Sequence, residues 1–269
     1  MDLRGASAEA LVGLTARLDD EIGTDQNAAA LGDELFMVSR LFRTEAALRR
    51  YATDASLAAE TKQGMVQQVF ADRVSAKTLV LLTDAAGRRW TLSRDLPDVL
   101  ERLSEIAVVR SAGVKAGQVT DELFALSGIV DANPRLRDAL SDPARSVDDK
   151  AALLDSLLDG KALAATVTLA KQSLAGTYRT MTAALASYRR VAAETQGETV
   201  ATVRVARPLA DADEWRLAEL LSSQYDTTVH LNVVVDPEVL GGLRVEIGDE
   251  VIDGTIASRL DDARRRLAG

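Results

Sequence analysis

Residues 240–260 read LGGLRVEIGDEVIDGTIASRL and predict a β-hairpin followed by a helix. In the first half of this stretch, apolar residues alternate with charged ones at the period of a half-buried strand: Leu243, Val245 and Ile247. Gly248-Asp249 supplies turn residues before Val251-Ile252. Asp253 is placed as an N-cap, and apolar residues then recur on one helical face: Ile256, Leu260, Ala263 and Leu267. We therefore expect a small α+β domain at this end of the chain.

The same domain extends upstream to Gly197, where the apolar period changes from helical to alternating. Val200 to Val205 predicts a strand, and the leucines near residue 220 predict a helix. Val229 to Val235 predicts a partner strand for the hairpin, and Pro237 ends it because proline has no N–H for the ladder.

Composition indicates helical bundles for the rest of the chain. Hydrophobic residues make up 47% of the 269 residues and aromatic residues only 4%, so Leu, Val and Ala must fill the cores. The absence of cysteine excludes disulfides and cysteine metal sites. The net charge of -9 disfavours nucleic acid and anionic lipid as partners. Since no apolar run approaches the roughly 20 residues of a bilayer span, and the first residues lack a signal-peptide pattern, we expect no direct membrane insertion.

Two consecutive segments carry the same order of predicted helices, which indicates a duplication. At an offset of 88 residues (136 minus 48), identical residues align: Leu48 with Leu136, Arg49 with Arg137, Asp54 with Asp142, Lys62 with Lys150, Ala76 with Ala164, Thr78 with Thr166 and Leu81 with Leu169. We divide the chain into a first helical bundle (1–110), a second helical bundle (111–196) and the α+β domain (197–269). The fold class is thus mainly α, with two tandem bundles before a small α+β domain. The predicted helix Thr91 to Val109 ends the first copy and begins the second, so one helix could serve both bundles.

Two stretches resemble a known family. VVVDPEVLGGLRVEIGDEVIDGTIASRL (residues 233–260) resembles the C-terminal signature of the delta subunit of F-type ATP synthases, called the oligomycin-sensitivity-conferring protein in mitochondria. AGRRWTLSRDLPDVL (residues 86–100) resembles the segment that closes the helical domain of that subunit. Subtracting one repeat, 269 minus 88, leaves 181 residues, close to the ordinary size of the family. The resemblance implies an elongated bacterial delta subunit whose second copy is collinear with the standard protein.

This resemblance implies a non-catalytic stator subunit of the peripheral stalk, on the cytoplasmic face of the bacterial cell membrane. Such a subunit links the α/β catalytic head to subunit b and resists rotation during proton-driven ATP synthesis. The implied partners are the N-terminal helices of α subunits, at the helical domain, and the end of subunit b, at the C-terminal domain. The alternative is a helical scaffold or regulator unrelated to ATP synthase, and a pull-down with α and b distinguishes the two.

Candidate partner-binding residues fall in two places. In the second copy, a stripe at i, i+4, i+7 and i+11 is our candidate wall for an apolar groove that takes a partner helix: Leu163, Val167, Ala170 and Leu174. Such a stripe is also typical of ordinary bundle core, and both interpretations stay open. In the terminal helix we assign partner binding to Ile256, Leu260 and Arg264. The run Arg264 to Arg266 also suits the C-terminal end of a helix without any partner, because its charge complements exposed carbonyls.

No residue pattern indicates catalysis. His230 is the only histidine, and it lies in a predicted strand without the companions of a zinc site. Gly113 to Gly117 lacks the pattern of a phosphate-binding loop. The acidic pairs near Asp19 and Asp148 lie beside predicted helix ends, where carboxylates are commonly solvated. An enzyme with an unrecognised site would need a perturbed acid or lysine in a closed pocket. We therefore predict neither enzymatic activity nor a cofactor or metal.

Overall fold

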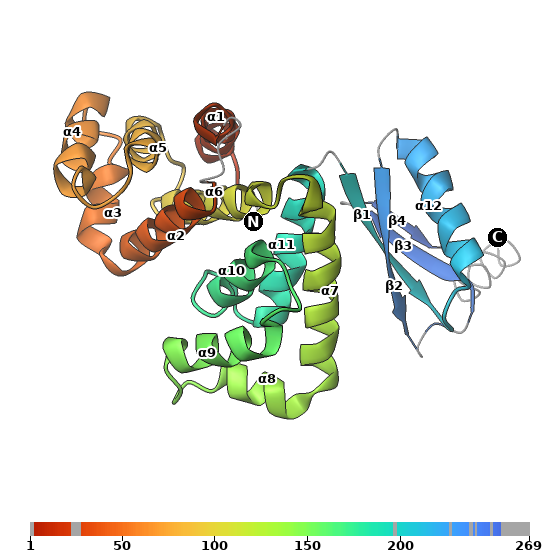
Figure 1. Cartoon of the computed structure of the whole chain (residues 1–269). Helices are drawn as coiled ribbons and strands as arrows, with labels where there is room; N and C mark the ends of the chain where they lie inside the picture. The colour runs from red at the N-terminus through yellow and green to blue at the C-terminus, as the bar shows by residue number, and fades with distance from the viewer. Residues whose placement is uncertain are drawn as a thin grey trace, which may run out of the picture. The chain divides into compact units, whose positions relative to one another are not determined.

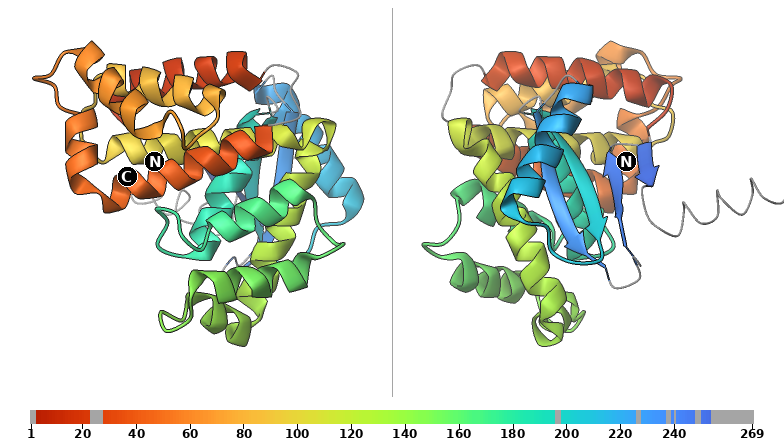
Figure 2. Two further views of the ribbon diagram at one scale, coloured as in Figure 1. Left: turned by 60° about the vertical axis from the view of Figure 1, so that its left-hand side comes forward. Right: turned by 90° about the vertical axis from the view of Figure 1, so that its right-hand side faces the viewer.

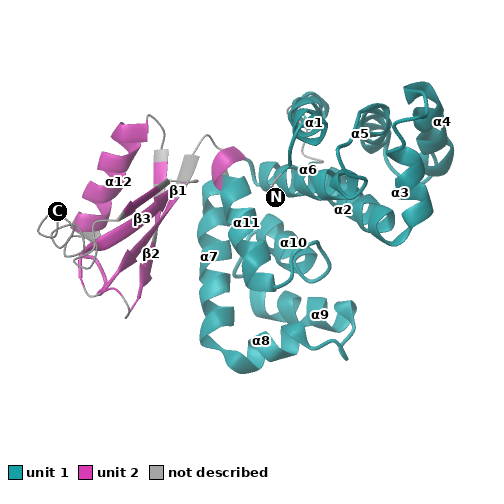
Figure 3. Ribbon diagram, turned by 180° about the vertical axis from the view of Figure 1, so that it is seen from behind, with its two compact units in different colours: residues 1–192 teal, residues 193–269 magenta. Residues whose placement is uncertain are grey.

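The computed structural model describes residues 3–22, 28–195, 198–225, 228–236, 239, 241–247 and 250–253 (Figure 1). The chain divides into two compact units, residues 1–192 and 193–269 (Figure 3). The first unit contains only helices among its described residues, and the second combines a four-stranded sheet with helix α12. The predicted class, mainly α with a small α+β domain, is confirmed. The finer division into 1–110, 111–196 and 197–269 stays our proposal.

Twelve α-helices and one 3₁₀ turn are described: α1 (Ala6–Ile22), α2 (Ala28–Thr44), α3 (Ala46–Ala52), α4 (Ala59–Phe70), α5 (Ala76–Gly87), α6 (Asp95–Ser111), η1 (Gly113–Lys115), α7 (Ala116–Ala132), α8 (Pro134–Ser141), α9 (Val147–Leu158), α10 (Ala164–Gln172), α11 (Met181–Thr195) and α12 (Asp211–Tyr225). Local sequence explains several helix starts. Ser75 and Ser146 cap α5 and α9 by accepting backbone N–H bonds, and Asn133 caps α8 just before Pro134. None of the described helices is long and apolar enough to cross a membrane.

The helix bounds repeat at the offset found in the sequence. Adding 88 to α2 (28–44) gives α7 (116–132), and adding 88 to α4 (59–70) gives α9 (147–158). A capping contact repeats too. Glu34 accepts hydrogen bonds from Ser75 N and the Thr78 hydroxyl at the start of α5. Glu122, which is 34 plus 88, does the same for Leu163 N and Thr166 at the start of α10. The predicted duplication is therefore present in the structure.

Helix α6 belongs to the hydrophobic cores of both copies. Its buried apolar residues from Leu96 to Ala107 pack in the first core, with α1 to α5 and with Val191 of α11. Val108 and Val109, at its end, pack in the second core, with α7 to α11. Figure 2 shows α6 running from the first group of helices to the second. One helix thus closes the first bundle and opens the second, as the overlap of the sequence repeats suggests.

The second unit has the strand order β2-β1-β3-β4, with β1 (Glu198–Val205), β2 (Thr228–Val235), β3 (Leu243–Ile247) and β4 (Glu250–Asp253). Strands β1 and β2 run parallel and are connected through α12, and β3 pairs antiparallel with both β1 and β4. Alternate residues of β1 and β3 form the core with Leu221 of α12: Ala201, Val203, Val205, Val245 and Ile247. The predicted β3–β4 hairpin is confirmed.

One strand pairing differs from the prediction. The segment Val229 to Val235 forms β2, but its neighbour is β1 and not the hairpin strand. The reason is the β1–α12–β2 connection, which places β2 parallel to β1 at the sheet edge, so that β3 pairs on the other side of β1. Gly242 precedes β3 with φ of 82°, a conformation that favours glycine. The terminal helix predicted after Asp253, with Ile256, Leu260 and Arg264, lies outside the described residues.

Candidate functional site: the polar junction on helix α6

Helix α6 carries a row of buried polar residues where the two helical cores meet. Asp95 begins the helix, and its carboxylate accepts hydrogen bonds from Ser7 (2.6 Å) and from Leu92 N (3.1 Å). Pro97 lies in the first turn, where its missing N–H breaks no helical bond. Further along, Glu101, Ser104 and Glu105 are buried although they are polar. Because buried polar groups are costly without partners, their contacts identify the elements that α6 holds together.

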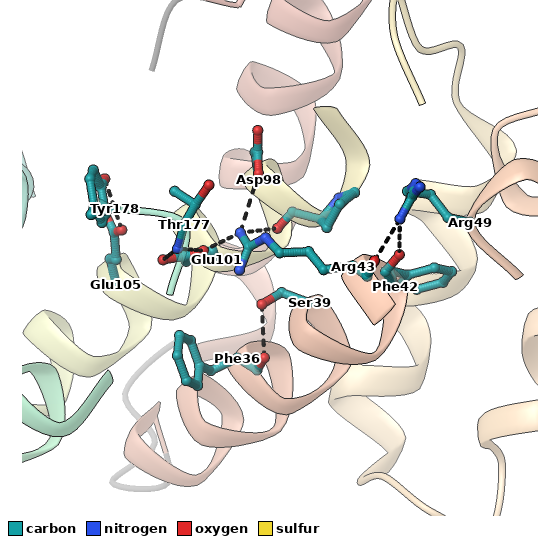
Figure 4. Close-up of polar contacts among 11 residues, drawn as sticks. Phe36, Ser39, Phe42, Arg43, Arg49, Asp98, Glu101, Glu105, Thr177 and Tyr178 are labelled. Atoms are coloured by element: carbon teal, nitrogen blue, oxygen red, sulfur yellow. Dashed lines mark hydrogen bonds and ion pairs between the residues drawn. The ribbon is translucent and has the colours of Figure 1, made fainter. Parts of the chain in front are cut away.

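Glu101 joins the two copies through one carboxylate. From the first copy, Arg43 near the end of α2 forms an ion pair with Glu101 and also reaches Asp98 at 3.2 Å. From the second copy, the backbone N of Thr177, between α10 and α11, donates to both carboxylate oxygens at 3.0 and 3.1 Å (Figure 4). The Glu101 side chain is only 1% exposed. The neighbouring Gly176 has its backbone so close to Glu101 that a Cβ there would collide with the carboxylate.

Glu105, one turn further along α6, faces α11 and the α10–α11 connection. The hydroxyl of Tyr178 donates to it at 3.3 Å, and Arg102 forms an ion pair with it at 3.3 Å. Tyr178 also shares a 2.6 Å hydrogen bond with Ser187 of α11 and packs edge-on against the Tyr188 ring. The Glu105 carboxylate thus connects α6 to the α10–α11 connection and, through Tyr178, to α11.

Close backbone approach completes the junction. The hydroxyl of Ser104 donates to the carbonyl of Gly32 on α2 at 2.6 Å and lies 3.4 Å from the amide oxygen of Gln172 on α10. A Cβ on Gly32 would lie 2.6 Å from the Val108 side chain. The backbones of α2 and α6 can therefore approach this closely only because position 32 is a glycine. We call Arg43, Glu101, Ser104, Glu105 and Thr177, with their contacts, the α6 junction.

Burial perturbs the acids of the α6 junction. Loss of hydration raises the pKa of Glu101, and the nearby Arg43 charge opposes that rise only in part. Burial raises the pKa of Glu105 to about 7, against the opposing charge of Arg102. Burial, together with the Glu105 charge, raises the pKa of the Tyr178 hydroxyl. The junction therefore holds one carboxyl group that titrates near neutral pH.

A cleft of about 670 Å³ opens beside the junction, lined in part by Asp98, Glu101, Glu105 and Tyr178. Its acids are engaged with the arginines and backbone groups named above. In the described part of the chain, no three His, Asp or Glu side chains are grouped to hold a metal ion. The arrangement is suited to fixing helices against one another.

The stripe predicted to bind a partner is divided in the structure. Ala170 is fully buried in the second core, and Leu163 and Leu174 are half-buried against it. Val167 and Leu174 line two different clefts, each of about 520 Å³. Leu163 and Leu174 lie just outside the ends of α10. Partner binding by these residues stays a prediction, and Ile256, Leu260 and Arg264 lie outside the described residues.

Two helical cores that share one helix, are joined through the buried Glu101 carboxylate and are followed by an α+β unit define a structural connector built mainly of helices. The sequence model of the ATP synthase delta (OSCP) subunit family matches residues 103–267. The chain belongs to this family, and the resemblance of its C-terminal signature is confirmed. It is a non-catalytic subunit of the peripheral stalk of an ATP synthase.

Similar proteins cover the whole chain. An ATP synthase subunit delta from a Nocardioides species is 53% identical over 268 residues, which cover 99% of this chain and 98% of that protein. Proteins of the same name from Streptomyces avermitilis and Thermobifida fusca are 41% and 37% identical, over at least 99% of this chain and all of each relative. The family match begins at residue 103, inside α6, so it covers the second copy and the α+β unit. The second copy is therefore the part collinear with the family, as predicted, and the relatives share the additional first copy.

Proposed function

We propose that this chain joins the catalytic head of an F-type ATP synthase to subunit b, on the cytoplasmic face of the cell membrane. In this proposal the helical unit receives N-terminal helices of α subunits and the α+β unit holds the end of b. The chain thereby resists rotation of the head while the rotor turns during proton-driven synthesis. Family membership and the resemblance of residues 233–260 support these assignments.

The observation that carries the mechanical part is the Glu101 carboxylate, which binds Arg43 of one copy and Thr177 of the other. A stator has to transmit force without yielding, and a buried carboxylate that is paired with an arginine on one side and accepts backbone hydrogen bonds on the other fixes its neighbours in one geometry. Because α6 lies in both hydrophobic cores, bending between the copies would require that helix to bend or both cores to open.

A pull-down with purified α and b tests the partners directly. The full chain is expected to retain both, in the nanomolar range or tighter, which corresponds to roughly 12 kcal/mol or more. A chain that ends at Asp236 is expected to keep its helical unit folded, and to bind α, but to lose b. A truncated chain that still retains b would refute the assignment of b to the α+β unit, and a full chain that retains neither subunit would refute the proposed function.

A further inference from the structure

An apolar groove lies along α2 of the first copy and is not part of the α6 junction. Its floor is formed by Phe36, Met37 and Leu41 of α2, Phe70 at the end of α4, and Val74 in the turn before α5. Its volume is about 550 Å³. Met37 is 53% exposed, which is unusual for a large apolar side chain in the middle of a bundle helix. We call this feature the α2 groove.

Two arginines border the α2 groove, Arg40 on α2 and Arg73 in the turn after α4. Both are exposed, and neither guanidinium forms a hydrogen bond or ion pair with any residue in the described ranges. Asp33 is the one acid among the residues that line the groove, so the two arginines leave its border with a net positive charge. In a chain of net charge -9, a positive rim around an apolar floor favours an occupant that carries carboxylates.

The groove is elongated, which favours a helix as its occupant. Its α2 wall extends from Asp33 to Thr44, a rise of about 16 Å at 1.5 Å per residue. That length matches about three turns of a second helix, whose apolar residues at i, i+3, i+4 and i+7 would meet the floor. Methionine beside aromatic rings is suited to such contacts because its flexible thioether adapts to the surface opposite.

The groove is only partly repeated in the second copy, where Phe124 and Ile129, the counterparts of Phe36 and Leu41, are exposed. At the repeat offset of 88, Phe36 aligns with Phe124, but Met37 aligns with Ala125 and Arg40 with Gly128. The second copy thus lacks both the exposed methionine and one of the rim charges at the equivalent positions. A binding role for this surface would belong to the part of the chain that precedes the family match.

We propose that the α2 groove binds an amphipathic helix of a partner subunit, about three turns long, with an apolar face on the groove floor and carboxylates that pair with Arg40 and Arg73. The proposal rests on the proposed function only in placing the chain within an assembled ATP synthase. It gives the additional copy an attachment of its own, separate from the stripe on α10.

Site-specific labelling tests the proposal, because the chain contains no cysteine of its own. Met37→Cys places one thiol in the groove, and Gln68→Cys, at an exposed position of α4 that does not line the groove, serves as the matched control. In the purified synthase, the groove thiol of Met37→Cys is expected to react with a maleimide about tenfold more slowly than in the free chain, whereas the control thiol of Gln68→Cys reacts equally in both. A photoreactive maleimide on the groove thiol is expected to cross-link to one segment with helical apolar spacing and acidic residues.

Charge variants test the rim. Arg40→Glu with Arg73→Glu is expected to lower the cross-link yield about tenfold, and Arg40→Lys with Arg73→Lys to retain most of it. Equal reactivity of the groove thiol in the free chain and in the synthase would overturn the proposal, as would a cross-link to a second copy of this chain, to lipid, or to a segment without those features. An unchanged yield in the glutamate variant would do the same. If the Met37→Cys chain co-purifies with α and b but its groove thiol stays reactive, only the proposal that the α2 groove binds a helix is refuted. If the chain is absent from the synthase, the proposed function itself is refuted.

Discussion

At the scale of single residues, Glu101 shows how a buried carboxylate is tolerated when its lone pairs are occupied. Arg43 satisfies it from one side and the backbone N of Thr177 from the other. Removing one partner of such a pair costs more than the pair itself contributes, because the remaining charge stays buried. The ion pair is therefore best tested by replacing Arg43, because that substitution leaves the Glu101 carboxylate buried without its cation.

Arg43→Met is expected to lower the free energy of unfolding of the helical unit by roughly 3 kcal/mol. The cost is at the low end of the range for buried pairs because Arg43 is 22% exposed and Thr177 N still supports Glu101. Urea unfolding followed by circular dichroism measures it. Arg50→Met, at an exposed position of α3, is the control and is expected to be nearly neutral. Adding Glu101→Gln to Arg43→Met is expected to restore part of the loss, and no restoration would contradict the ion-pair interpretation.

Glu105 predicts a pH dependence. Its folded pKa of about 7 lies above the ordinary glutamate value of 4.5, so the folded chain holds this proton more tightly than the unfolded chain does. The stabilisation is fully present below about pH 4.5 and is lost as the pH rises through about 7. Glu105→Gln should remove this dependence and stabilise the chain at pH 8, by at most about 3 kcal/mol. Unfolding free energies at pH 5, 6, 7 and 8 test it, with Glu45→Gln, an exposed acid, as control. Parallel pH curves for Glu105→Gln and the unmodified chain would contradict the prediction.

At the scale of elements, the contact between α2 and α6 depends on the missing side chain of Gly32. Its hypothetical Cβ would lie 2.6 Å from Val108 and 3.1 Å from the Ser104 carbonyl. Gly64, in α4, has nothing within 4 Å of the same position. The two helical glycines therefore separate the effect of packing from that of helix propensity.

Gly32→Ala is expected to destabilise the helical unit by about 1–3 kcal/mol, because the two helices must move apart. Gly64→Ala is expected to stabilise it by up to about 1 kcal/mol, since alanine is the better helix former. Thermal unfolding of both variants gives the comparison. If Gly32→Ala stabilised the unit as Gly64→Ala does, α2 and α6 would have room to adjust, and the packing interpretation would be wrong.

The helices and their repetition were accessible from the sequence because they depend on local apolar spacing and on short capping patterns. Glu34 and Glu122, with Thr78 and Thr166, could also have been found at the offset of 88. The α6 junction could not have been found from the sequence. Glu101 and Glu105 resemble exposed helix acids until their partners, 58 to 76 residues away along the chain, are known. Likewise, apolar spacing could not distinguish core from groove on α10, where Ala170 is buried.

At the scale of the whole molecule, the shared helix predicts that the two helical copies unfold together. Val108 and Val109 of α6 lie in the second core, and the preceding residues of the same helix lie in the first. Opening either core removes one side of α6, so the other core loses part of its support. The unit of residues 193–269 has its own core and is expected to unfold separately.

Leu154→Ala tests this coupling, because Leu154 is fully buried in the second core, on α9. We expect a loss of about 2–5 kcal/mol and, because the copies are coupled, faster hydrogen exchange in the slowest amides of α2 as well as of α7. Leu221→Ala, in the core of the other unit, is the matched control and is expected to leave exchange in α2 and α7 unchanged. If Leu154→Ala accelerated exchange in α7 but not in α2, the copies would be independent domains, and the proposal that α6 carries force between them would be wrong. Acceleration in both, without an effect of Leu221→Ala, would identify residues 1–192 as one cooperative unit.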